Sequence, residues 1–134
     1  MKSVTIIADD KVGLLADISY VLGKAKINIE SISVDVTGGK AVIGLILSDE
    51  NRGKNVLEAS GYNVGELNSI VIKLPDQSGE LSRITTSLSK EGVNIQNVHM
   101  LSKDGKNTVI SVVVDKPKRA STLLKDYLIG GEES

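Results

Sequence analysis

Short apolar runs and one helical stripe make up the pattern of the first third of the chain. Residues 4–8 form an apolar run rich in β-branched side chains, which predicts a strand. Apolar residues then recur at spacings of three, four and three, which predicts one face of a helix. They are Leu15, Ile18, Leu22 and Ala25. Residues 27–37 predict a second strand, whose alternation slips near Glu30 and Ser31. We therefore expect a β-bulge there.

A glycine pair, Gly38 and Gly39, separates this strand from another apolar run at residues 41–47. Two glycines between β-rich runs predict a tight hairpin, so residues 41–47 are the returning strand. Residues 49–60 predict a weaker helix, and residues 62–67 predict a short fourth strand. The first half therefore has the order β-α-β-β-α-β.

The chain then repeats this pattern at an offset of 66 residues without a gap, so that Asp10 aligns with Asp76 and Gly13 with Gly79. A period of this size, present twice, predicts two domains in tandem. We place them at residues 1–67 and 68–134. The second half has expected strands at residues 70–74, 93–102 and 108–114, and expected helices that begin at Gly79 and Pro117. Gly130 and Gly131 resemble a tail, so its last strand is expected to be missing or shortened.

This order predicts an α+β fold of two ferredoxin-like βαββαβ sandwiches in tandem, with antiparallel sheets and both helices of each half on one face. Alternation in the first half assigns Thr5, Ile7, Ile43, Leu45 and Leu47 to one sheet face, and Val4, Ile6, Val42 and Ile46 to the other. An apolar face without a helix normally meets a partner, and a shortened last strand leaves an open edge. We therefore expect a homodimer or a higher homo-oligomer.

Composition narrows the classes of function. The formal net charge is −1, and the chain has no Phe or Trp and only three Tyr, which argues against nucleic-acid binding. There is no Cys, so disulfides, thiol nucleophiles and thiolate metal sites are excluded. No apolar run is long enough to span a membrane, and we expect a cytoplasmic protein. The acidic residues lack the spacing of a metal-binding loop, so we predict no metal and no cofactor.

The loop between the first strand and the first helix carries the candidate site in each half. A helix N-terminus offers free backbone N–H groups that suit a carboxylate, and the glycine leaves room for a ligand. Asp10 and Asp76 could accept an α-ammonium group, and Asn28 and Asn94 could both donate and accept hydrogen bonds. Together these groups could hold a free amino acid. The alternative is structural, because Asp commonly caps helices and Asn commonly occupies turns.

The pattern strand, Asp-x-x-Gly-x-Leu, helix, Val/Ile-Asn-Ile, strand resembles an ACT domain, present at residues 3–67 and again at 69–129. The resemblance implies a small regulatory domain that binds amino acids or similar metabolites at interfaces between domains. A proline usually precedes the family's glycine, where this chain has Val12 and Ser78. Serine-binding members carry Asn at the position of Asp10 and Asp76, so serine is not implied. The implied contacts are Asp10, Val12, Gly13, Leu14 and Asn28, and Asp76, Ser78, Gly79, Glu80 and Asn94.

Three classes of function follow. The first is a regulatory protein that binds an amino acid and modulates a partner, such as an enzyme. The second is a protein–protein interaction or oligomerisation module without a ligand. The third, an enzyme on the same scaffold, is disfavoured, because an acylphosphatase-like site needs an Arg where the loops have Lys11 and Gln77. His99, the single histidine, has no catalytic triad or metal cluster around it in the sequence and is expected at an interface or surface.

Overall fold

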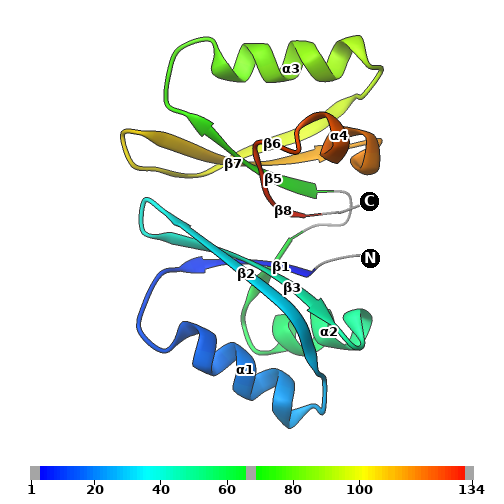
Figure 1. Cartoon of the computed structure of the whole chain (residues 1–134). Coiled ribbons are helices and arrows are strands. Elements are labelled where there is room, and N and C mark those ends of the chain that lie inside the picture. The colour runs from blue at the N-terminus through cyan, green and yellow to red at the C-terminus, as the bar shows by residue number, and fades with distance from the viewer. Residues whose placement is uncertain (1–3, 66–68, 132–134) are drawn as a thin grey trace.

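The computed structural model describes residues 4–65 and 69–131 of the chain (Figure 1). The first half contains six elements in the predicted order. They are β1 (Val4–Asp9), α1 (Leu14–Lys24), β2 (Ile29–Thr37), β3 (Lys40–Leu47), α2 (Glu50–Ala59) and β4 (Asn63–Val64). The predicted fourth strand is thus reduced to two residues within the described part. The end of that predicted strand and the expected boundary between residues 67 and 68 lie outside the described residues.

The second half repeats the order. Its elements are β5 (Ser69–Pro75), α3 (Glu80–Lys90), β6 (Ile95–Lys103), β7 (Asn107–Val114), α4 (Pro117–Leu123) and β8 (Leu128–Gly131). The predicted class, two βαββαβ units in tandem, is confirmed. The last strand is present and short, with four residues. Gly130 and Gly131 belong to it, so the sequence-based interpretation of these residues as a tail was wrong, because glycines carry no strand signal of their own.

Each half forms one four-stranded antiparallel sheet, with strand orders β2-β3-β1-β4 and β6-β7-β5-β8. The bulge predicted in the first half is confirmed, and the second half contains the equivalent bulge. The register shifts between Ile29 and Ser31 on β2, and between Ile95 and Asn97 on β6. The bulge lets each long edge strand bend at the point where it leaves the preceding helix.

α1 and α2 cover one face of the first sheet. Ile6 of β1 lies directly opposite Ile43 of β3, and both are fully buried under the helices. The sequence assigned these two residues to opposite faces, which was wrong, because each strand's alternation does not fix its register with its neighbour. On α1, Ile18 and Leu22 are buried as predicted, but Leu14 is buried in place of Leu15, which is 42% exposed.

The same arrangement holds in the second half, where α3 and α4 cover the second sheet. This core contains Ile70, Ile72, Leu74, Ile84, Leu88, Val93, Ile110, Val112, Val114, Ala120 and Leu124. Pro117 is the first residue of α4, as predicted. The helix ends at Leu123, and Leu128 already belongs to β8.

The two sheets pack against each other through the faces that carry no helix (Figure 1). A small cluster of Val42, Val71 and Val109 lies between them, with β8 over β3 and β1, and β7 over β2. The prediction that these faces would require a second chain is therefore corrected. Each half supplies the cover for the other, and burial of these apolar faces stabilises the chain itself.

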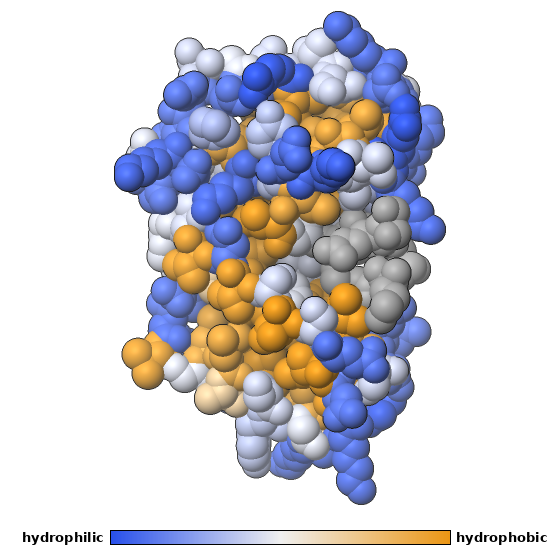
Figure 2. All heavy atoms as spheres, in the orientation of Figure 1, coloured by the Kyte–Doolittle hydropathy of each residue, from blue (hydrophilic) through white to orange (hydrophobic). Residues whose placement is uncertain are grey.

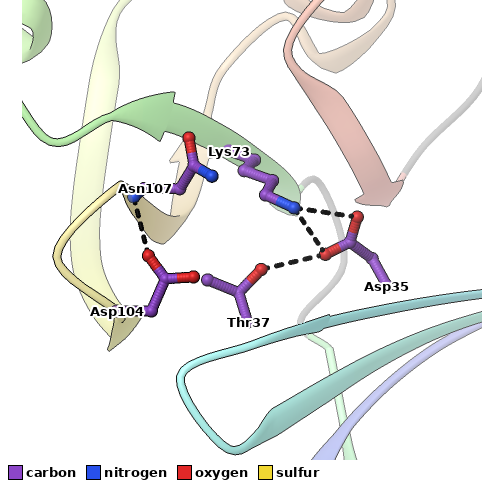
Figure 3. Close-up of polar contacts among 5 residues, drawn as sticks. All are labelled: Asp35, Thr37, Lys73, Asp104 and Asn107. Carbon is purple, nitrogen blue, oxygen red and sulfur yellow. Dashed lines mark hydrogen bonds and ion pairs between the residues drawn. The ribbon is translucent and has the colours of Figure 1, made fainter.

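Polar contacts at the hairpin end reinforce this packing. Lys73 of β5 reaches across to Asp35 of β2, with Nζ 3.3 Å from Oδ1, and Thr37 donates a hydrogen bond to the same carboxylate (Figure 3). The β2–β3 turn also touches the second half. A Cβ built on Gly38 would lie 2.7 Å from the backbone oxygen of Lys103. The two halves are therefore in backbone contact at this turn.

The long strands β2 and β6 are each the last strand at one edge of their sheet. Because β7 lies over β2, and β6 follows β7, both edges lie on the same flank of the molecule. Large apolar side chains on these strands point toward the helix side but are not covered. They are Ile32, Val34 and Val36 on β2, and Val98 and Met100 on β6, each 39–63% exposed. Figure 2 shows apolar atoms gathered over β2 on this flank.

Candidate functional site

Glycine shapes the loop that leads into the first helix of each half. Gly13 has φ +88° and ψ 0°, and Gly79 has φ +88° and ψ −13°, a left-handed conformation that suits glycine. No side chain caps either helix N-terminus. In the first half, the Leu14 N–H donates weakly to Lys11 O at 3.3 Å, and the Asp17 N–H donates to Gly13 O at 2.9 Å. The backbone N–H groups between them face outward at the start of α1.

Asp10 and Asp76 are held through their backbones. The Asp10 N–H donates to Gly39 O at 2.8 Å, and the Asp76 N–H donates to Lys106 O at 2.8 Å, which fastens each loop to the adjacent hairpin. Neither carboxylate caps a helix, so the alternative interpretation of these residues as caps was wrong. Their side chains differ. Asp10 is exposed and has no partner among the described residues, whereas Asp76 Oδ1 lies 3.5 Å from Lys103 Nζ.

Asn28 and Asn94 begin the approach to the second strand of each half. The Asn28 N–H donates to Ser48 Oγ at 3.0 Å, and the Asn94 N–H donates to Asp115 Oδ1 at 2.9 Å. Both side chains are exposed. Asn28 follows α1, whereas Asp10 precedes it, and an eleven-residue helix is about 16 Å long. Figure 1 places these two loops at opposite ends of α1. The structure therefore does not bring the predicted Asp and Asn together within one half.

The other predicted residues offer mainly backbone. Val12 is fully exposed at the loop, and Leu14 is buried in the core, so neither side chain is placed for polar recognition. Ser78 is exposed, and Glu80 is paired with Arg83, whose Nη2 lies 2.7 Å from Glu80 Oε2. Within the described residues, no three His, Cys, Asp or Glu side chains gather as a metal site requires. None of the described helices is long and apolar enough to span a lipid bilayer.

A cleft of about 750 Å³ opens in the first half between the β1–α1 loop and the turn from α2 to β4. The lining residues are Ile7, Ala8, Asp9, Lys11, Val12, Gly13, Leu14, Asp17, Lys40, Ser60, Gly61, Tyr62 and Asn63. Three predicted residues, Val12, Gly13 and Leu14, form part of its wall. Asp10 and Asn28 are not among the lining residues. The charged groups of the cleft are Asp9, Lys11, Asp17 and Lys40.

Two fixed pairs order these groups. Lys40 Nζ lies 2.5 Å from Asp9 Oδ1, and the hydrogen bond and charge of this lysine lower the pKa of Asp9. The Tyr62 hydroxyl donates to Asp17 Oδ2. Burial, followed by this hydrogen bond and the negative charge of Asp17, raises the pKa of Tyr62 to about 12. The phenol therefore stays protonated at neutral pH and keeps the Asp17 carboxylate in place.

Sequence reasoning missed both pairs. Asp9 and Lys40 are direct neighbours across β1 and β3, so a worked-out hairpin register could have found them. Asp17 and Tyr62 are 45 residues apart, and no local pattern links them. In the second half, Arg83 stands at the position equivalent to Asp17 and donates to the Tyr127 hydroxyl at 3.2 Å.

Residues 2–59, which include β1 to α2, match the model of the ACT domain. The first half of the chain is therefore similar to an ACT domain over this stretch. The matched segment contains the β1–α1 loop, Asp10 and Asn28, and the second half repeats the same order of elements. The candidate residues of the first half, Asp10 and Asn28, therefore lie within the segment that matches the ACT domain.

Solved structures similar to this chain include three with comparable coverage. A protein from Bacteroides thetaiotaomicron is 21% identical, covering 96% of this chain and 90% of its own, with a TM-score of 0.48. The ligand-free regulatory subunit of aspartate kinase from Thermus thermophilus is 11% identical, with coverages of 93% and 91% and a TM-score of 0.44. The acetolactate synthase small subunit from Thermotoga maritima is 15% identical, with coverages of 96% and 89% and a TM-score of 0.41. No curated protein sequence matches the chain.

Proposed function

We propose that this chain is a cytoplasmic, non-catalytic regulatory protein that binds an amino acid and modulates a partner such as an enzyme. It consists of two ACT-like domains, residues 1–67 and 68–134, and works as a homodimer. The observation that carries the proposal is the pair of loops flanking α1. Both candidate groups, Asp10 and Asn28, are exposed on a segment that matches the ACT domain, yet they lie at opposite ends of an eleven-residue helix. A complete site then needs the Asn of a second copy beside the Asp of the first.

The flank formed by β2 and β6 supports the second copy. It presents two long edge strands whose backbone groups can pair with another strand, and it exposes five large apolar side chains. In a two-fold symmetric dimer, this flank of one copy would pack against the same flank of the other. On this arrangement α1 of one copy runs opposite to α1 of its partner. The loop of one copy then approaches the α1–β2 turn of the other.

A regulatory effect follows from a site of this kind. A ligand bound between two copies binds the assembled arrangement more tightly than the separated one, so it shifts the population of arrangements. An exposed carboxylate such as Asp10 holds an ammonium group by charge-assisted hydrogen bonds. The outward N–H groups at the start of α1 receive a carboxylate. An amino acid carries both groups, which is why we prefer it to a simple anion.

The first experiment is a thermal-unfolding screen of the full chain against the common amino acids, with Asp10→Ala and Asn28→Ala beside the parent. A ligand at a hundred times its Kd raises the free energy of unfolding by roughly 2.7 kcal/mol, which is a clear shift of the midpoint. We expect one amino acid to shift the parent and neither variant. A flat screen on a well-folded homodimer refutes the ligand and leaves the interaction module as the function.

Mixing the two variants tests whether the site is shared between copies. Neither variant alone binds, but a mixed dimer places the intact Asp10 of one chain beside the intact Asn28 of the other. Random exchange of equal amounts restores about one quarter of the parental sites, since half of the dimers are mixed and each has one complete site. Calorimetric titration measures this fraction. Recovery with Asn94→Ala in place of Asn28→Ala would instead assign the second contribution to the partner's other half.

A further inference from the structure

The two halves differ at the residues that would contact a ligand, although they share one backbone pattern. Asp10 has no partner among the described residues, whereas its equivalent Asp76 lies 3.5 Å from Lys103 Nζ. A ligand ammonium group therefore meets a free carboxylate in the first half. In the second half it has to displace a lysine. Breaking the existing ion pair with Lys103 offsets part of the binding free energy that a new ion pair with the ligand would contribute.

The first turn of the following helix differs more strongly. Asp17 in the first half is replaced by Arg83 in the second, so the sign of the charge is reversed. Each residue meets a tyrosine that comes from near the end of its half: Tyr62 donates to Asp17, and Arg83 donates to Tyr127. The same position thus presents a hydrogen-bond acceptor in one half and a donor in the other.

The acceptor in the first half faces a cleft. Tyr62 and Asp17 both line the space of about 750 Å³ behind the β1–α1 loop. Tyr62 engages Asp17 Oδ2, which leaves Oδ1 without a hydrogen-bond partner among the described residues. The carboxylate is also held in place by the tyrosine, so little side-chain entropy is lost when a ligand binds it.

The other charged groups of the cleft do not neutralise the Asp17 carboxylate. Asp9 and Lys40 form an ion pair at 2.5 Å and neutralise each other. Lys11 lies on the exposed loop and forms no ion pair with a described residue, so a contact from it requires a long side chain to be ordered. Asp17 is therefore the ordered, unpaired charge that a ligand entering the cleft would meet.

We propose that the first half alone binds the ligand and that its cleft selects amino acids whose side chain carries hydrogen-bond donors, with Asp17 and Tyr62 as the specificity-determining pair. This inference rests on the proposed function, because the loop that would hold the ligand's main-chain groups is also a wall of the cleft. Basic and amide side chains, those of lysine, arginine, glutamine and asparagine, satisfy Asp17. Apolar side chains would desolvate Oδ1 of Asp17 without giving it a hydrogen-bond partner.

The test is a calorimetric titration of the intact chain with lysine, arginine, glutamine, asparagine, leucine and valine, each measured separately. We expect one of the four donor-bearing amino acids to bind best. Asp17→Asn keeps the shape and the tyrosine contact but removes the charge, and Tyr62→Phe removes the hydroxyl that positions the carboxylate. Both variants should weaken binding about ten-fold or more, as expected for loss of a charge-assisted contact.

The second half provides matched controls, since Arg83→Gln and Tyr127→Phe alter the equivalent pair and should leave the Kd within about two-fold of the parent. Circular dichroism of every variant confirms that the fold is kept. Tight binding of leucine or valine, or equal binding by the parent, Asp17→Asn and Tyr62→Phe, overturns this inference and leaves the proposed function standing. Absence of binding by the parent to all amino acids overturns both.

Discussion

Replacement of Gly38 by alanine tests the contact between the two halves most directly. Gly38 has φ +58° in the β2–β3 turn, and a Cβ there lies 2.7 Å from Lys103 O and 3.0 Å from Lys103 N. Ordinary van der Waals contacts of a Cβ begin near 3.4 Å, so the oxygen is about 0.7 Å too close. These are backbone atoms of another half, which cannot rotate away as a side chain can.

The magnitude follows from two contributions. Any L-residue in the left-handed region costs about 1–2 kcal/mol of folding free energy. Overpacking against a rigid neighbour adds about 1–3 kcal/mol. Gly38→Ala should therefore lose about 2–5 kcal/mol of the free energy of unfolding. Gly39→Ala is the matched control, because Gly39 has φ +78° in the same turn but nothing lies within 4 Å of its Cβ. It should lose only the first contribution.

The assay is urea unfolding of the parent and both variants, monitored by circular dichroism. The free energies of unfolding are compared for variants whose m-values equal that of the parent. Gly105→Ala serves as a second control in the facing β6–β7 turn, where φ is +87° and the Cβ position is also open. Equal losses for Gly38→Ala and Gly39→Ala would refute the packing of the two halves against each other at this turn. A larger loss at Gly38 supports it.

Three further predictions concern single positions. Asp49→Ala removes the side chain that accepts from the Arg52 N–H at the start of α2, and should cost about 1 kcal/mol in urea unfolding, while a loss near zero would contradict this capping role. Leu88→Ala empties a fully buried position in the second core and should cost about 2–5 kcal/mol by the same measurement, so a smaller loss would contradict its tight packing. In ultraviolet titration, one of the three tyrosines should ionise only near pH 12, and Tyr62→Phe should remove that phase. Because its folded pKa lies above the unfolded value of 10, the stability from Tyr62 should be complete below pH 10 and fall as pH rises toward 12, whereas ionisation of all tyrosines near pH 10 would contradict the contact with Asp17.

Local signals predicted most of the fold. The spacing of Ile18 and Leu22, the glycine pair and the slipped alternation near Ser31 each act over a few residues, and the structure contains the helix, the hairpin and the bulge that they predict. Register is a relation between strands, so the opposition of Ile6 and Ile43 was missed. The packing of the sheets was missed for a related reason. An apolar face such as that of Val42 needs cover, but its composition does not say whether the cover comes from the same chain.

The candidate site was predicted only in part. The sequence correctly placed the start of a helix at Gly13, whereas the left-handed conformation of this glycine and the lack of a side-chain cap are known only from the structure. It treated Asp10 and Asn28 as one site, although the predicted helix between them already separates their positions by its own length. The cleft pair of Asp17 and Tyr62 depends on where the closing segment returns over α1. The position of the segment that follows α2 depends on the packing of the whole half and not on any short motif.

The placement of β2 and β6 on one flank also decides whether assembly of copies ends or continues. A molecule with unpaired sheet edges on opposite sides can bind two neighbours, so copies assemble into an open-ended filament. Here both long edges lie on the same flank, while the opposite edges are the short strands β4 and β8. A single partner can therefore occupy both long edges at once. In the proposed homodimer, growth would stop at two copies, and the sheet edges most prone to aggregation would be removed from solvent in the same step.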